Sequence, residues 1–229
     1  MEQDKLKTKK IHQRTNILGI IINILAFLIF IAAIYYLFTK GVLPFIGMTI
    51  YALALMTPRF IYKRIYNYNT QINKFDTALL SWTEILVTTA IILNSIGYLW
   101  LFDKIFLFII GYDTFAHFIT PILLTLALAL ILIFYNNLNN KQIHKSKFLL
   151  LLIFITIVYT FLWEVFEYVI DLFWHVGIFG EEDQPLDTVY DLVADVLSIP
   201  VTSVIIYKYY DYINNRVSKL KLITKRKKR

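Results

Sequence analysis

The chain has 229 residues, 58% of them hydrophobic, with a formal net charge of +7 and no cysteine. Several apolar stretches exceed the ~18 residues that indicate a membrane-spanning helix, which excludes an ordinary soluble domain. Without cysteine, disulfides, thiolate metal sites and cysteine nucleophiles are excluded as well. Glycine and proline are few, and no segments of about ten alternating residues occur, so helices are favoured over a β-barrel.

Six apolar stretches predict an all-α, polytopic membrane bundle of six transmembrane helices. In chain order, the expected helices cover residues 17–38, 42–57, 79–102, 112–135, 148–174 and 188–207. The first apolar run of about 22 residues is longer than that of a signal peptide, so we expect it to remain as a helix. The second is short and is expected to stop at Pro58 and Arg59. Segment 103–111 is too short to span, and we expect it to lie in the interface or to extend the fourth helix.

The placement of Lys and Arg predicts the orientation of these spans, because cytoplasmic loops carry an excess of both residues. With both termini cytoplasmic, 21 of the 23 Lys and Arg fall on one side. This predicts a basic N-terminal tail at 1–16, a six-helix transmembrane domain at 17–207 and a basic C-terminal tail at 208–229. The positive charge therefore indicates topology and attraction to anionic lipid headgroups rather than a nucleic-acid partner.

Acidic residues gather on the opposite, outer side, where eleven carboxylates face only Lys40 and Lys104. Many of them share helix faces. On the fourth expected helix, Asp113 and His117 are spaced i and i+4. On the fifth, Glu164, Glu167 and Asp171 are spaced i, i+3 and i+7, and His175 follows one turn later. On the sixth, Asp187, Asp191 and Asp195 are spaced i, i+4 and i+8. Spans 5 and 6 are joined by a short outer loop, so these ends are expected to lie together.

Carboxylates that cluster without cations must share protons or bind a metal ion. Hard oxygen ligands with an imidazole suit Mg²⁺, Mn²⁺, Ca²⁺, Zn²⁺ or non-haem iron. We therefore expect a divalent metal ion at Asp113, His117, Glu167 and Asp191, with Glu164 and Asp195 in catalytic roles. Other pocket residues are expected at Asp171, His175, Asp187 and Asn94; simple solvation is the alternative for the first three, and helix–helix contact is the alternative for Asn94. Glu84 is expected to reach water or Lys74.

Three stretches, "YDTFAHF", "WEVFEY" and "LDTVYDLVAD", resemble the YjdF-type family of prokaryotic polytopic membrane proteins, a domain of unknown function. The similarity covers about residues 80–205. In the part of the family pattern that corresponds to "LDTVYDLVAD", a Trp usually stands beside the first aspartate. Here Val189 and Tyr190 stand in its place. A looser similarity links the chain to VanZ-like proteins. These resemblances imply a multi-pass protein of a prokaryotic plasma membrane, and they imply no particular reaction.

Three functions remain open from the sequence. The first is a metal-dependent enzyme acting on a lipid or lipid-linked envelope substrate, with a spare carboxylate as general base. The second is a proton or cation transporter, because carboxylates and histidine inside a membrane are typical of ion pathways. The third is a non-catalytic envelope regulator or structural protein whose acidic cluster holds the bundle together. Whether the protein is an enzyme is left open, and the sequence indicates no particular protein partner.

Overall fold

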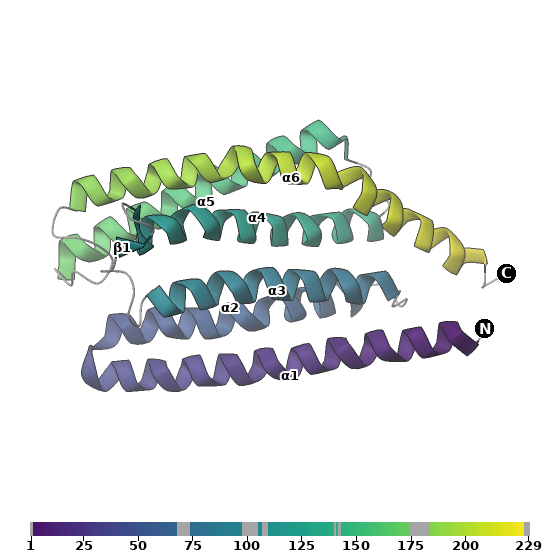
Figure 1. The fold of residues 1–229 in the computed structure, drawn as a ribbon, viewed down its shortest axis with the longest axis horizontal. Coiled ribbons are helices and arrows are strands. Elements are labelled where there is room, and N and C mark those ends of the chain that lie inside the picture. Colours follow the sequence, from purple (N-terminus) through teal and green to yellow (C-terminus); the bar gives the residue numbers. More distant parts are fainter. Residues whose placement is uncertain are drawn as a thin grey trace. The chain divides into compact units, whose positions relative to one another are not determined.

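The computed structural model of the chain describes residues 2–67, 74–97, 105–106, 110–139, 141, 143–174 and 184–226. Side chains are described within narrower limits, chiefly residues 17–62, 78–97, 111–137, 143–169 and 188–215. The described chain is almost entirely helical. The helices are α1 (Glu2–Thr39), α2 (Val42–Asn67), α3 (Lys74–Ile96), α4 (Tyr112–Leu138), α5 (Lys145–Trp174) and α6 (Gln184–Arg226), and Figure 1 draws them in chain order from purple to yellow.

Each of these six helices contains a stretch long and apolar enough to cross a membrane. The stretches are Ile17–Thr39, Val42–Tyr62, Ala78–Ile96, Tyr112–Asn137, Lys145–Val169 and Thr188–Asn215. Large apolar side chains such as Phe27, Leu53 and Val204 are exposed on them. Exposed apolar surface of this extent is what a lipid bilayer covers, and a helix satisfies all its own backbone hydrogen bonds there. The predicted all-α bundle of six spans in a multi-pass membrane protein is thus confirmed.

Helix α2 does not stop where the sequence predicted. Pro58 and Arg59 lie inside it, and the helix continues to Asn67. Proline breaks one backbone hydrogen bond and costs about 3 kcal/mol in the interior of a helix in water. In a membrane, unwinding the chain would expose several more backbone groups to lipid, so the continued helix is the better alternative.

Two further boundaries differ from the sequence prediction. Ile105–Phe106 (β1) and Ile110–Gly111 (β2) form a short antiparallel pair, so this segment does not extend the fourth helix, which begins at Tyr112. The sixth helix continues far beyond residue 207, and its apolar stretch reaches Asn215. Pro200 lies within that helix, as Pro121 lies within α4.

The chain divides into two compact units. The first comprises Met1–Ile91, Leu130–Gln142 and Tyr212–Arg229, and the second comprises Ile92–Ala129 and Ile143–Asp211. In the first unit, α1 and α2 pack against each other after a tight turn at Gly41. The Gly41 φ of 100° lies in the left-handed region, and its N–H donates to Tyr36 O at 2.9 Å, which closes the end of α1.

The described part of the first unit has a small apolar core and an ion pair whose carboxylate is buried. Ile22, Ala26, Leu55 and Ile91 form the core, in which the α1 residues are spaced one turn apart. Nearby, Arg59 on α2 donates to Glu84 on α3, from Nε to Oε1 at 2.7 Å and from Nη2 to Oε2 at 3.2 Å. Only 1% of the Glu84 side chain is exposed. The expectation that Glu84 reaches water is therefore wrong, and Arg59 can pair with it because Arg59 lies inside a helix and not in a loop. The side chain of Lys74, the alternative partner, lies outside the described residues.

The second unit is built from α5, most of α6 and the first two-thirds of α4, with the last turn of α3. Hydrogen bonds made by side chains join its helices. Tyr112 Oη donates to Leu93 O at 2.8 Å, and Asn94 Nδ2 donates to Thr120 Oγ1 at 2.8 Å. At the start of α5, Lys145 Nζ lies 2.7 Å from Asp211 Oδ2 on α6. This unit contains every described member of the predicted acidic cluster.

Candidate metal centre

Helix α4 supplies the histidine at the centre of the cluster. The helix starts at Tyr112, which places Asp113 in its first turn and His117 one turn later. A carboxylate in the first turn is stabilised by the unpaired backbone N–H groups there. Asp113 Oδ1 lies 3.8 Å from His117 Nε2. The two residues therefore share a helix face, as their spacing indicated.

The Nδ1 side of the imidazole faces one carboxylate from α5 and one from α6. Glu164 Oε1 lies 3.0 Å from Nδ1, and Asp195 Oδ1 lies 3.7 Å from it. Both side chains are almost completely buried, with 4% and 3% of their surfaces exposed. Nδ1 can donate its proton to only one of them at a time, so this side of the ring holds more acceptors than the ring can satisfy.

The Nε2 side faces three carboxylates, one from each helix. Asp113 on α4, Glu167 on α5 and Asp191 on α6 place an oxygen at 3.8, 3.8 and 3.9 Å from Nε2. Asp113 and Glu167 are more open than the rest of the cluster, at 12% and 13% exposed, whereas Asp191 is 2% exposed. The Nε2 side is therefore the more accessible side of the imidazole.

The six residues described so far are called the His117 cluster: Asp113, His117, Glu164, Glu167, Asp191 and Asp195. No basic residue in the surrounding sequence can neutralise the charge of its carboxylates. The chain contains no Lys or Arg between residues 112 and 140 or between 148 and 207. Burying a carboxylate without a partner is costly, and buried charges are normally paired or coordinated to a metal. The cluster therefore requires shared protons or a bound cation.

The positions of the ligand atoms fit a metal ion. Asp113, His117 and Asp191 each offer one atom within 4.8 Å of the others, and His117, Glu164 and Glu167 form a second such group. Glu164 Oε1 is buried, and despite its 3.0 Å approach to Nδ1 it has no correctly directed hydrogen bond. This oxygen is therefore available either to accept a proton from the imidazole or to contact a bound cation.

The other predicted pocket residues divide into two sets. Asn94 bonds Thr120, three residues beyond His117, which fits the helix–helix contact that was its alternative. The side chains of Asp171 and Asp187, and His175 as a whole, lie outside the described residues. Their participation in the pocket stays a prediction.

A row of hydroxyl groups next to the cluster was not predicted from the sequence. Thr156 and Thr160 precede Glu164 on α5, and Ser198 and Thr202 follow Asp195 on α6; all four are buried. Their spacing of three or four residues continues the helix faces of the carboxylates. That periodicity was available in the sequence, but single hydroxyls in apolar helices are common and gave no separate signal.

A family model described as "Predicted membrane protein (DUF2238)" matches residues 22–212, which is most of the chain. The chain belongs to this family. The resemblance to the YjdF-type proteins is thereby confirmed, and membership adds no reaction, because the family is described only as a predicted membrane protein. No curated protein and no solved structure matches the chain.

Proposed function

We propose that this DUF2238 protein binds one divalent metal ion on the Nε2 side of His117 and uses it to act on a lipid or lipid-linked envelope substrate. The proposed ligands are His117, Asp113, Glu167 and Asp191. The observation that carries the proposal is the convergence of one carboxylate from each of α4, α5 and α6 within 3.9 Å of Nε2. A bound cation would account for carboxylates that no basic residue of these helices can neutralise.

The donor set limits the kind of ion. Three carboxylates and one imidazole suit Mg²⁺, Mn²⁺, Fe²⁺ or Zn²⁺, whereas a purely structural zinc site would normally use thiolates, which this chain lacks. Four protein ligands leave room for a water or a substrate oxygen on an ion that prefers six. A metal with an open position can activate a bound water or polarise a substrate oxygen.

Glu164 and Asp195 are proposed to hold the imidazole in place. Both lie on the Nδ1 side, and metal-binding histidines usually donate their other N–H to a carboxylate that fixes the ring. In this arrangement Nδ1 carries the proton and Nε2 keeps its lone pair for the metal. A general-base role for either carboxylate is a further prediction that requires it to reach a bound substrate.

The lipid nature of the substrate is inferred from the surroundings of the site. Val165 and Phe166, which lie between Glu164 and Glu167 in the sequence, are exposed on α5, as are Val189 and Tyr190 just before Asp191 on α6. These apolar side chains contact lipid in a membrane, so a molecule already in the bilayer would approach the cluster from the side. The open carboxylates Asp113 and Glu167 would be its first polar contacts.

The test is elemental analysis of protein purified in detergent without chelator. Wild type should hold about one divalent ion per chain, and the ion should be absent from His117→Ala and Asp191→Asn. Asp211→Asn is the matched control. Asp211 belongs to the same unit, but its carboxylate is exposed, bonds Lys145 and lies outside the cluster. Wild type without metal would overturn the proposal and favour shared protons, and hence proton or cation movement.

A structural role is the second candidate, because the ligands come from three different helices and a metal would tie them together. Thermal melts of the same variants separate the two roles. If His117→Ala loses the metal but melts near wild type, the ion is not required for folding. A metal-loaded wild type that converts a component of a membrane lipid extract, detected by mass spectrometry and absent with His117→Ala, would establish catalysis.

A further inference from the structure

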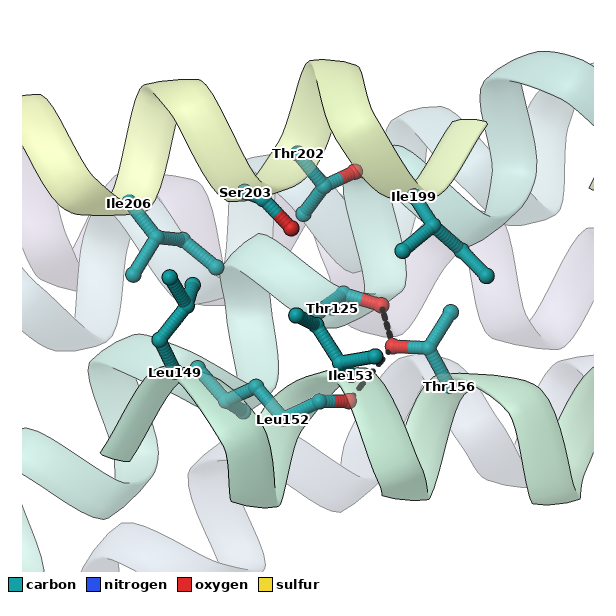
Figure 2. A pocket seen from close by; sticks show the side chains of 9 residues that line it. All are labelled: Thr125, Leu149, Leu152, Ile153, Thr156, Ile199, Thr202, Ser203 and Ile206. Atoms are coloured by element: carbon teal, nitrogen blue, oxygen red, sulfur yellow. Dashed lines mark hydrogen bonds between the residues drawn. The ribbon is translucent and has the colours of Figure 1, made fainter. Parts of the chain in front are cut away.

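A small cavity lies between α4, α5 and α6 in the second unit, deeper in the helices than the His117 cluster. Its volume is about 10 Å³. Four hydroxyl residues, Thr125, Thr156, Thr202 and Ser203, share its lining with five leucine and isoleucine side chains (Figure 2). A space of roughly 10–15 Å³ on this measure accommodates one water molecule.

The hydrogen bonds around the cavity show what it can accept. Thr156 donates its single hydroxyl proton to Leu152 O at 2.8 Å, so Thr125 must be the donor in the 2.8 Å bond between the two threonines (Figure 2). Thr202 donates its proton to Ser198 O at 2.9 Å. The three threonine protons are all used within the protein, while their oxygens retain lone pairs. The three threonines of the lining therefore favour a ligand that donates hydrogen bonds to them.

Water is the ligand that fits this chemistry. A metal ion would need more oxygen ligands than the four hydroxyls of the lining, and it would need a carboxylate to compensate its charge, which the lining does not contain. A water molecule can donate to two hydroxyl oxygens, and buried waters typically make about three hydrogen bonds to groups of this kind.

Buried hydroxyls lie between the cavity and the cluster along α5 and α6. Thr160 lies between Thr156 and Glu164 on α5, and Ser198 lies between Thr202 and Asp195 on α6. Ser198 Oγ donates to Asp195 O at 2.6 Å. Thr156 stands eight residues before Glu164, which corresponds to about 12 Å along a helix. One buried hydroxyl on each of α5 and α6, Thr160 and Ser198, thus lies between the cavity and the carboxylates over about two turns of helix.

We propose that the cavity binds a water molecule and forms the inner end of a hydrated seam that starts at the His117 cluster. This inference does not depend on a bound metal. Water enters and leaves the cavity along the hydroxyls of α5 and α6, whereas the outward-facing sides of the same helices stay dry in lipid. Only species of about the size of a water molecule can follow this route.

Substituted-cysteine accessibility tests the proposal directly, because the chain has no cysteine of its own. Thr202→Cys and Ser203→Cys place a thiol at the cavity. Val204→Cys is the control, at nearly the same depth on α6 but 67% exposed on the outer surface of the helix. Membrane vesicles are treated with Ag⁺, a small thiol-reactive cation, and the remaining thiol is counted with a fluorescent maleimide after unfolding in SDS.

Because a thiol reacts as the thiolate, which forms in water and not in hydrocarbon, Ag⁺ should modify Thr202→Cys at least about tenfold faster than Val204→Cys. Ser203→Cys should react with Ag⁺ at a rate similar to that of Thr202→Cys. It provides the same test if the Thr202→Cys protein does not accumulate in the membrane. Adding Thr156→Val, which removes one water acceptor at nearly constant volume, should slow the reaction. Equal rates at Thr202→Cys, Ser203→Cys and Val204→Cys would overturn the proposal, whether or not the cluster holds a metal.

Discussion

His117 Nδ1 on α4 lies 3.0 Å from Glu164 Oε1 on α5, the shortest contact between the imidazole and a carboxylate of the His117 cluster. Both side chains are buried, at 9% and 4% exposed. On the other edge of the ring, Nε2 points toward Asp113, Glu167 and Asp191. The geometry thus separates the carboxylate nearest Nδ1, which we propose orients the imidazole, from the three near Nε2 that are proposed to bind a metal with it.

The first prediction concerns this contact. Glu164→Gln keeps an oxygen that can accept the Nδ1 proton, so metal affinity should fall by no more than about tenfold, whereas Glu164→Leu should cost about a hundredfold. His117→Ala should abolish binding. Competition with a fluorescent chelator measures the dissociation constants for Mn²⁺ and Zn²⁺. If Glu164→Leu bound as tightly as wild type, Glu164 would have no positioning role.

The second prediction concerns the ion pair between Arg59 and Glu84. Removing Arg59 leaves a carboxylate that is 1% exposed, whereas removing Glu84 leaves a guanidinium side chain that is 37% exposed. Arg59→Met should therefore lower the free energy of unfolding by about 3–5 kcal/mol, the cost of an unpaired buried charge. Glu84→Gln should cost only about 1–2 kcal/mol, because the amide still accepts a hydrogen bond.

Unfolding by SDS titration in mixed micelles, followed by circular dichroism, measures both variants. The double variant Arg59→Met with Glu84→Met is the control, and it should be more stable than Arg59→Met alone, since it leaves no buried charge. Equal losses for the two single variants would contradict the assigned asymmetry.

The third prediction concerns Gly19 on α1. A Cβ atom at this position would overlap the Arg59 guanidinium, which Glu84 holds in place. Gly19→Ala should therefore destabilise the protein by about 1–3 kcal/mol, the usual cost of overpacking. Gly47→Ala on α2 is the matched control, because a Cβ there meets nothing within 4 Å. It should be neutral or stabilise the helix by up to about 1 kcal/mol.

The same unfolding titration separates steric overlap from a helix effect. In the background of Arg59→Met with Glu84→Met, the cost of Gly19→Ala should largely disappear, because the obstructing guanidinium is gone. A cost that persisted unchanged in that background would show that Gly19 is required for some other reason.

The fourth prediction concerns the orientation of the six spans. The excess of Lys and Arg near the chain ends and in the 58–77 and 136–147 segments predicts that both termini are cytoplasmic. A C-terminal green fluorescent protein fusion should therefore fluoresce in bacterial cells. Alkaline phosphatase fused within 176–183 should be active, since that segment is predicted to face outward. The reverse pattern would invert the topology and place the His117 cluster on the cytoplasmic side.

The sequence predicted the membrane spans well and their ends less well. Apolar stretches of about 20 residues are a direct consequence of bilayer thickness, so all six spans could be recognised. The end of α2 was misplaced because proline was taken to stop a helix, and in lipid the alternative to a helix is worse. That error also placed Arg59 in a loop and hid its pairing with Glu84, which joins residues 25 positions apart.

What the sequence determined by itself is the class of protein and the composition of the candidate site. Helical periodicity placed Asp113 with His117, Glu164 with Glu167 and Asp191 with Asp195, because residues three or four apart share a helix face whatever the helix packs against. The tertiary structure alone decided how these faces meet. It set Glu164 and Asp195 against Nδ1, turned three carboxylates toward Nε2, and aligned the buried hydroxyls of three helices around one cavity. Contacts between helices depend on their rotation and relative depth, and no local pattern in the chain fixes either.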